Sequence, residues 1–321
     1  MTPSWCAWYP FAEQTRPGDR AARGWLKQPA AGTASIAGAC PCGLFVFARP
    51  RSIGAVVYAT PYDELNSVLQ ELAERVESAL GEALVGVYLQ GSFAVGGFDE
   101  HSDCDFIAVT ERELTAGEVA ALQEVHAKVY DIECEWAKHL EGSYFPRDVL
   151  RSCDRAGARL WYLDHGARSL IRDAHCNTVV VRWVLRERGV ALIGPDPATL
   201  VDPVPREILR QDISDTMRGW GAEILEDPDR FRNRFYQGFI VLSYCRMLRD
   251  RQDGTIGSKR DGAEWAKSNL DERWYDLIDR TWECRPDPAW QVRQPPDKSD
   301  FARTLEFVRY SLAILAEMET L

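Results

Sequence analysis

Long apolar runs are absent from this 321-residue sequence. No stretch approaches the roughly 18 to 20 apolar residues that a membrane-spanning helix needs. The first thirty residues also lack the order of basic and then apolar residues that marks an export signal. We therefore expect a protein that has no membrane partner and that works in the cytoplasm.

The sequence also lacks a long basic tract and an excess of positive charge. It holds 38 Lys and Arg residues against 49 Asp and Glu residues, which gives a formal net charge of −11. A negative surface repels phosphate backbones and attracts small cations. We therefore expect no nucleic-acid partner and a small, cationic molecule among the ligands.

A disulfide framework is missing too, because the nine cysteines are scattered and odd in number. Cys40 and Cys42 form a close pair, but no second pair of Cys or His residues follows at the spacing of a zinc site. The interpretation is a set of reduced thiols. With 45% hydrophobic residues the chain has the composition of an ordinary globular protein, and its length favours two domains.

The pattern of residues divides the chain into parts. Residues 1–56 are rich in Ala, Gly and Pro without a helical or strand period, which predicts a poorly ordered extension. In residues 57–175, apolar spacing predicts two helices and three strands: a helix that ends at Gly81, strands over 83–89, 106–109 and 140–145, and a helix over 115–130. This alternation predicts an α/β domain over residues 57–175, with a mixed sheet and flanking helices.

From about residue 178 onward the pattern changes to helices alone. Apolar stripes at helical spacing mark five helices, which start near Val180, Pro205, Phe235, Trp274 and Phe301. Residues 176–321 are therefore predicted to form an all-α bundle. The predicted fold class is α+β.

The stretch between the first two predicted strands carries residues that fit a nucleotide site. Gly91 lets the backbone come close to a triphosphate, and Ser92 offers a hydroxyl and an N–H group to its oxygens. After ten further residues, Asp103 and Asp105 stand at alternate positions at a strand entrance, so both carboxylates point to one side and can bind Mg²⁺. Each element alone also fits a plain turn or a surface acidic pair, but their combination favours a nucleotide-and-metal site.

A Gly-Ser turn followed at this spacing by Asp-x-Asp resembles the signature of the nucleotidyltransferase superfamily. More narrowly, the sequence is similar to the aminoglycoside 3″-adenylyltransferases of the streptomycin and spectinomycin type. The similar segments run from the first predicted domain into the second: residues 89–97, 101–105, 189–195, 202–205, 245–248 and 257–266. The resemblance extends from about residue 60 to the end of the chain, and it implies that residues 57–175 form the nucleotidyltransferase domain.

The resemblance implies an enzyme that transfers AMP from ATP to a hydroxyl group of a small acceptor, with an aminoglycoside as the expected acceptor. It also implies Mg²⁺, two ions being the expected number. Asp103 and Asp105 would bind the metal, and Gly91, Ser92 and Ser102 would bind the nucleotide.

Such a transferase needs a base that takes the proton from the attacking hydroxyl. The family carries it as a Glu within a Leu-Glu pair on a third strand. Three glutamates compete for this role, Glu133, Glu135 and Glu141. Glu141 follows Leu140 in the most strand-like segment, and we choose it as the base and as a third metal ligand, with Glu135 in reserve.

By the same resemblance, Arg246 and Lys259 are expected to contact the nucleotide. Lys259 follows Ser258, a predicted helix N-cap with Asp261 as its partner three residues later. A Lys in the first turn is unfavourable to the helix dipole unless an anion such as phosphate binds there. The alternatives are a structural ion pair for Arg246 and a solvated side chain for Lys259.

The acceptor side departs from the family pattern. Members of the streptomycin type carry a Trp shortly after a Phe-Gly pair, where this sequence reads Asp164 to Arg168. A positive charge at Arg168 would repel a cationic drug. Asp164, His165 and Tyr236 are candidate acceptor contacts only, and for His165 we favour a hydrogen bond to the backbone.

Other functions stay open on the sequence alone. One is a nucleotidyltransferase with a protein or metabolite acceptor, and another is a nucleotide-binding regulatory module without turnover. We expect a monomer in each case.

Overall fold

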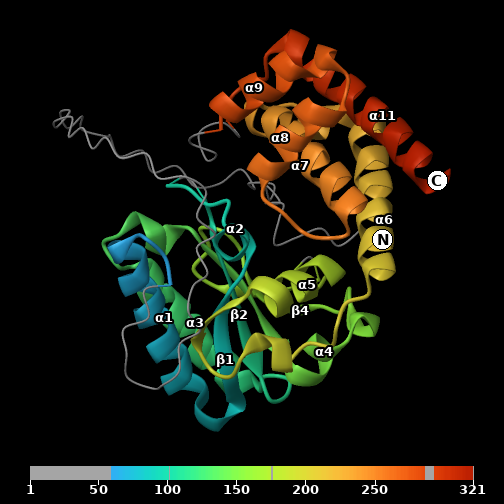
Figure 1. The fold of residues 1–321 in the computed structure, drawn as a ribbon. Coiled ribbons are helices and arrows are strands. Elements are labelled where there is room, and N and C mark those ends of the chain that lie inside the picture. Colours follow the sequence, from blue (N-terminus) through green and yellow to red (C-terminus); the bar gives the residue numbers. More distant parts are fainter. Residues whose placement is uncertain (1–58, 101, 175, 286–292, 321) are drawn as a thin grey trace, which may run out of the picture. The chain divides into compact units, whose positions relative to one another are not determined.

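The structure is a computed structural model that describes residues 59–100, 102–174, 176–285 and 293–320. The predicted extension over residues 1–56 lies outside the described residues, and so do Cys40 and Cys42. The described chain forms a six-stranded sheet, helices that pack on it, and a C-terminal helical region (Figure 1).

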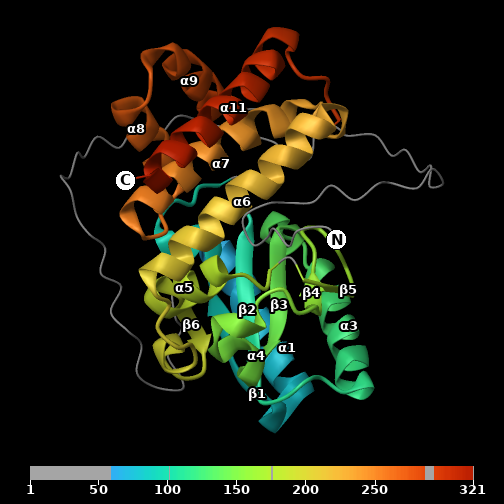
Figure 2. The same ribbon diagram turned by 90° about the vertical axis from the view of Figure 1, so that its right-hand side faces the viewer.

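The sheet has the strand order β5-β4-β3-β2-β1-β6, so that β2 and β3 lie at its centre (Figure 2). The strands are β1 (Leu84–Leu89), β2 (Cys104–Thr110), β3 (Leu140–Pro146), β4 (Leu160–Leu163), β5 (Leu170–Asp173) and β6 (Val190–Ile193). β2 and β3 run parallel, whereas the other neighbouring strands pair antiparallel. The sheet is therefore mixed, as predicted.

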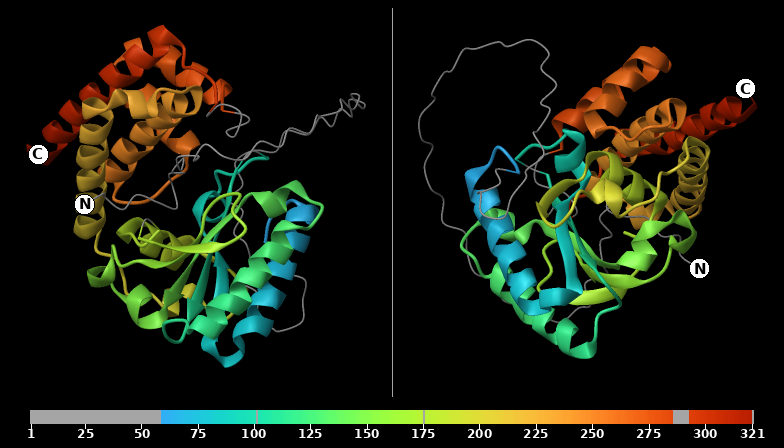
Figure 3. Two further views of the ribbon diagram at one scale, coloured as in Figure 1. Left: turned by 180° about the vertical axis from the view of Figure 1, so that it is seen from behind. Right: turned by 60° about the horizontal axis from the view of Figure 1, so that its bottom comes forward.

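Helices α1 (Asp63–Leu80) and α3 (Ala116–Tyr130) lie side by side on one face of the sheet (Figure 3). Their apolar residues form one cluster with every second residue of β2, namely Cys104, Phe106 and Ala108. Helix α3 starts with a capping box between Thr115 and Glu118, which satisfies N–H groups at its first turn.

The intervening residues of β2, Ile107 and Val109, belong to a second apolar cluster. That cluster includes Val181 and Leu185 of α5 (Val179–Arg188) and continues into the helical region. Because the side chains on its two faces pack into two apolar clusters, β2 is buried along its whole length. The strand is thus a rigid support for residues at its entrance.

In residues 206–285 and 293–320 the structure describes five long helices: α6 (Arg206–Glu226), α7 (Arg234–Asp253), α8 (Lys259–Asn269), α9 (Tyr275–Glu283) and α11 (Lys298–Thr320). Helix α7 contacts the other four helices and is buried along most of its length. Within the described residues no helix has the length and apolar character of a membrane span.

Shorter elements connect these helices and strands. Two are single-turn helices, α2 (Gly91–Val95) and α4 (Arg147–Arg151). The others are 3₁₀ helices: η1 (Gly81–Ala83), η2 (Glu135–Lys138), η3 (Cys153–Arg155), η4 (Pro197–Thr199), η5 (Pro228–Phe231) and η6 (Glu272–Trp274).

The predicted fold class is confirmed, and each predicted helix and strand has a counterpart in the structure. The expectation of helices alone after residue 178 is wrong, because Val190–Ile193 forms β6 and pairs with β1. β4 and β5 were also missed, since strands of four residues are too short to show a clear alternation. The division at residue 175 stays a prediction, although the sheet takes β6 from beyond it.

Candidate active site

Two carboxylates lie next to each other on the central strands of the sheet. Asp105 of β2 is in register with Glu141 of β3. Residues opposite each other on neighbouring strands point to the same face, here the face that also carries Ile107 and Phe145. Both carboxylates are buried, with 6% of Asp105 and 3% of Glu141 exposed. The proposed base and one proposed metal ligand are thus brought together.

Negative charge accumulates around Asp105. Burial raises the pKa of Asp105 well above its usual value, and the charges of Glu141 and Asp103 raise that pKa further. Lys259 and Arg246 oppose this shift only in part. A bound cation would relieve the repulsion among these carboxylates. Carboxylate oxygens are the ligands that Mg²⁺ prefers. Asp103, Asp105 and Glu141 have this chemistry, and their joint binding of Mg²⁺ stays a prediction.

The residues of the predicted Gly-Ser turn form the start of the short helix α2 and lie directly against these carboxylates. Gly91 has a positive φ of 64°, and a Cβ atom at this position would collide with the side chain of Asp105. The N–H group of Gln90 donates to the backbone oxygen of Asp105 at 3.0 Å. Ser92 Oγ lies 3.5 Å from the backbone oxygen of Asp103. The missing side chain at Gly91 therefore leaves space that the carboxylate of Asp105 occupies.

Ser102 stabilises the loop that leads to Asp103. Its hydroxyl accepts the N–H group of Asp99 at 2.9 Å and donates to the Asp99 carboxylate at 3.2 Å. A role of Ser102 in nucleotide binding stays a prediction.

Arg246 of α7 and Lys259 of α8 bring positive charge to the carboxylates. Gly262 of α8 lies so close to the backbone of Arg246 that a Cβ atom there would collide with it, so the two helices are in close contact. Burial and the charge of Arg246 lower the pKa of Lys259 to about 8, while Asp103 and Asp105 act in the opposite direction. Both predicted cations therefore interact electrostatically with the predicted metal ligands.

Helix α8 begins as predicted. Ser258 Oγ accepts the N–H group of Asp261 at 3.0 Å, and the Asp261 carboxylate accepts the N–H group of Ser258 at 2.8 Å. Lys259 is the first residue of the helix. The free N–H groups of this turn add to the positive potential beside the carboxylates.

Two histidines adjoin the carboxylates, and the sequence did not predict this arrangement. His165 Nδ1 lies 3.0 Å from Asp103 Oδ1, and His165 Nε2 lies 3.3 Å from His139 Nδ1. Burial lowers the pKa of His165, but the hydrogen bond and the charge of Asp103 outweigh this effect and raise it to about 9. Burial acts to raise the pKa of Asp103, whereas the hydrogen bond from His165 lowers it below its usual value.

The favoured interpretation of His165, a hydrogen bond from its ring to the backbone, is therefore wrong. β4 pairs antiparallel with β3, so the loop that follows β4 lies beside the first residues of β3. His165 is in that loop, and its ring therefore contacts Asp103. No local signal in the sequence reports that pairing. His139 stands two residues before Glu141 in the sequence. This spacing was the available sign that His139 lies near the carboxylates.

Among the three candidate bases, Glu141 is the one that lies on β3 beside Asp105. Glu133 and Glu135 are exposed, and Glu135 starts the 3₁₀ helix η2. Cys176 Sγ lies 4.0 Å from Glu141 Oε1, a contact that the sequence did not reveal.

The charge of Arg168 is balanced in the structure. Its guanidinium group forms an ion pair with Asp131 at 2.7 Å and lies 4.8 Å from the ring centre of Tyr130. The expected repulsion of a cationic acceptor is therefore weakened, because the positive charge of Arg168 is paired with a carboxylate.

The candidate acceptor contacts lie in different surroundings. Asp164 accepts hydrogen bonds from the Tyr162 hydroxyl at 2.9 Å and from the backbone N–H group of His165 at 3.0 Å. Tyr236 is buried at the start of α7 and contacts other rings, those of Phe231, Phe235 and Phe239. Asp164 is thus adjacent to the carboxylate cluster through His165, whereas the contacts of Tyr236 are those of a core residue.

A Gly-Ser turn and three carboxylates on a mixed sheet, followed by a helical region, define a nucleotidyltransferase-type protein. Comparison with known proteins agrees. Residues 199–311 match a family model described as the C-terminal domain of aminoglycoside adenylyltransferase. An aminoglycoside (3″)(9) adenylyltransferase from Shigella flexneri is 25% identical over 239 residues, which cover 67% of this chain and 83% of the relative.

A spectinomycin 9-adenylyltransferase from Staphylococcus aureus is 24% identical over 225 residues, which cover 67% of this chain and 82% of the relative. A solved structure is also similar, that of the spectinomycin adenyltransferase AAD(9) from Enterococcus faecialis with ATP and spectinomycin. Its TM-score is 0.58 at 13% identity, over 78% of this chain and 98% of that chain, which supports the fold. The chain is thus similar to aminoglycoside and spectinomycin adenylyltransferases over two thirds of its length, and residues 199–311 match the C-terminal domain of that family.

Proposed function

We propose that this protein transfers AMP from ATP to a hydroxyl group of an aminoglycoside or of spectinomycin, with Mg²⁺ as the metal. The observation that supports this most is the pairing of Asp105 with Glu141 on one face of the sheet, with Gly91 held against Asp105. The relatives named as aminoglycoside and spectinomycin adenylyltransferases support the same reaction.

In the proposed reaction, the acceptor hydroxyl oxygen attacks the α-phosphorus of ATP. A new P–O bond forms, the bond from the α-phosphorus to the oxygen that bridges to the β-phosphate breaks, and pyrophosphate leaves. Glu141 takes the hydroxyl proton, with the carboxylate fixed beside Asp105 by the β2–β3 register.

Mg²⁺, held by Asp103, Asp105 and Glu141, would supply positive charge to the triphosphate, and two ions are the expected number. Arg246 and Lys259 add charge from the helical region, and the first turn of α8 offers N–H groups to a phosphate. Gly91, Ser92 and Ser102 are the further residues proposed for nucleotide binding.

We propose a small, cationic acceptor. The carboxylates of Asp103, Glu141 and Asp164 lie around His165 and act on its charge, so this region attracts a cation. The pairing of Arg168 with Asp131 weakens the electrostatic repulsion that Arg168 would exert on an aminoglycoside. A monomeric state and a cytoplasmic location stay predictions.

A pyrophosphate-release assay with ATP, Mg²⁺ and a panel of aminoglycosides that includes streptomycin, together with spectinomycin, tests this function. Mass spectrometry of the acceptor should show a product that has gained AMP. We expect Asp103→Asn to abolish both signals and the exposed control Asp215→Asn on α6 to preserve them. Equal pyrophosphate release by wild type and Asp103→Asn would rule the proposal out.

A further inference from the structure

Asp103, His139 and His165 form a cluster that the proposed reaction uses only through Asp103. One ligand atom from each residue lies within 4.8 Å of the others. We infer that this cluster is a binding site for a transition-metal ion, for which Zn²⁺ and Co²⁺ are suitable probes. Neutral imidazole nitrogens suit such ions, whereas Mg²⁺ prefers oxygen ligands. The ring nitrogen of His165 that binds the ion would release its proton to the solvent on binding.

Two contacts within the cluster are as short as the distances between ligand atoms on one ion. Donor atoms bound to Zn²⁺ at about 2.0 to 2.2 Å lie roughly 3 to 3.5 Å from one another. His165 lies 3.0 Å from Asp103 and 3.3 Å from His139, measured between the nearest donor atoms. His165 uses a different ring nitrogen for each contact, so a ring must turn before a single ion joins all three residues.

The backbone of three neighbouring strands places the ligands. Asp103 precedes β2 and His139 precedes β3, and the N–H group of Cys104 donates to the backbone oxygen of His139 at 2.9 Å. β4 pairs with β3 so that Gly142 faces Leu163, and His165 follows Leu163 by two residues. Ligands supplied from paired strands are held more precisely than ligands on a free loop.

The cluster is partly exposed to solvent, and neighbouring residues contact its two histidines. The side chain of Asp103 is 32% exposed and that of His165 is 24% exposed, while His165 Nδ1 itself is buried. The ring of Trp136 packs edge-on against His139, and the Asp164 carboxylate fixes the backbone of His165 at 3.0 Å. Such outer contacts orient the ligands of metal sites.

Asp103 is shared with the proposed magnesium site. An ion bound with His139 and His165 would therefore compete with Mg²⁺ for Asp103. This consequence rests on the proposed function, whereas binding of the ion itself does not.

Titration calorimetry of the full-length chain with Zn²⁺, without nucleotide, tests the site. The chain should carry Cys40→Ser and Cys42→Ser, because that thiol pair also attracts Zn²⁺. In this background we expect one Zn²⁺ to bind, and His139→Asn and His165→Asn each to weaken its affinity by at least about tenfold. Glu135→Gln is the matched control, since Glu135 is exposed in the same segment, and it should bind as the parent does.

Visible absorption of bound Co²⁺ gives a second signal, which both histidine variants should lose. Thermal unfolding in EDTA shows whether each variant is folded, and two variants are used so that one failure to fold does not decide the result. Parent-like Zn²⁺ affinity in a folded histidine variant, or no Zn²⁺ binding by the parent, would overturn the inference. Zn²⁺ binding without adenylyl transfer would contradict the proposed function alone.

Discussion

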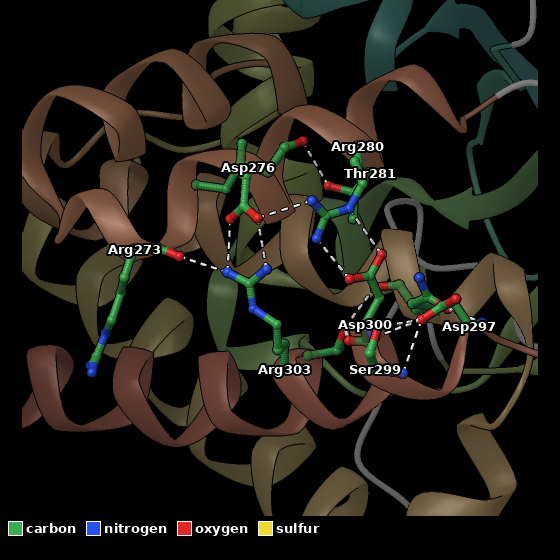
Figure 4. A network of polar contacts seen from close by, with 11 residues as sticks. Arg273, Asp276, Arg280, Thr281, Asp297, Ser299, Asp300 and Arg303 are labelled. Carbon is green, nitrogen blue, oxygen red and sulfur yellow. Dashed lines mark hydrogen bonds and ion pairs between the residues drawn. The ribbon is translucent and has the colours of Figure 1, made fainter.

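Aspartates of the sheet and aspartates of the C-terminal helices lie in opposite electrostatic surroundings. Asp105 is buried beside like charges, and its pKa is well above the usual value. Asp276 of α9 accepts hydrogen bonds from Arg303 and Arg280, which hold its pKa below the usual value (Figure 4). The same residue type therefore favours its protonated form in one region and its ionised form in the other.

The network between α9 and α11 shows what balanced charges do. Arg303 binds both oxygens of Asp276 at 2.8 and 2.9 Å, and Arg280 binds both oxygens of Asp300 at 2.7 and 3.1 Å (Figure 4). The Asp276 side chain is 58% exposed, so water screens these pairs and their contribution to stability is modest. Balanced charge links α9 and α11 with a modest gain in stability, whereas the excess of negative charge at Asp105 supports the proposed binding of a cation.

The largest expected effect comes from removing the charge of Asp105. We expect Asp105→Asn to lower the rate of AMP transfer roughly 10³-fold, because the proposed metal loses a ligand worth several kcal/mol. In EDTA the same variant should be more stable than wild type, because the repulsion with Glu141 and Asp103 is gone. Steady-state kinetics and urea unfolding measure the two effects. A loss of both activity and stability would show that Asp105 is a structural residue.

The next effect concerns His126, a neutral group on the face of the sheet covered by α1 and α3. His126 Nε2 lies 2.8 Å from the Tyr144 hydroxyl, and burial lowers the pKa of His126 from 6.5 to about 4. A depressed histidine pKa gives stability that is present above the unfolded pKa and is lost as pH falls through the folded pKa. Wild type should lose roughly 3 kcal/mol more than His126→Gln between about pH 7 and pH 4. Urea unfolding across this range measures the difference, and equal slopes would contradict the prediction.

A smaller effect is expected at Gly91. In Gly91→Ala the new Cβ atom collides with Asp105, so we expect kcat/KM to fall about 100-fold through misplacement of that carboxylate. Gly96→Ala is the matched control, because Gly96 also has a positive φ, of 85°, and has open space around it. Both variants should lose about 1 kcal/mol of stability through backbone strain, and Gly91→Ala should lose more. Similar activities of the two variants would disprove the role assigned to Gly91.

The smallest effect is expected in the balanced network. Asp276→Asn should lower the free energy of unfolding by about 0.5 to 1 kcal/mol at low salt, and by less at high salt. Because the pKa of Asp276 is lowered in the fold, wild type should lose this advantage as the pH falls into the acid range. Activity should stay within about twofold of wild type, since the residue lies outside the proposed site. Urea unfolding at two salt concentrations measures the effect, and a salt-independent loss would argue against ion pairing.

Much of the fold could be predicted because apolar spacing and helix-capping residues are visible over short stretches of sequence. The stripe of α1 and the stop at Gly81 appear where the sequence placed them, and the capping box of Ser258 and Asp261 forms at α8. β4, β5 and β6 escaped prediction because each has four residues and depends on its partner strand. Short strands gain their hydrogen bonds only after distant segments meet.

The site, too, was predictable where its residues are close in sequence and not where they come from distant segments. Asp103 and Asp105 are two residues apart, so strand geometry alone predicts that both point to one side. In the structure Asp105 lies on β2, and Asp103 directly precedes that strand. The placement of Glu141 beside Asp105 followed the strand-like pattern after Leu140, and the register confirms that neighbourhood. The contacts of His165 with Asp103 and of Arg168 with Asp131 join segments far apart in the chain, and no local pattern encodes them.

The sequence by itself determined the α+β order of elements, the Gly-Ser turn, the alternating aspartates and a net charge of −11, because periodicity and covalent spacing act over a few residues. Only the tertiary structure decided where that charge is balanced and where it accumulates. Register between strands placed Asp105 against Glu141, and helix packing placed Arg280 and Arg303 around Asp276. The pKa of a carboxylate depends on burial and on charges a few ångströms away, which the chain sets only when it folds.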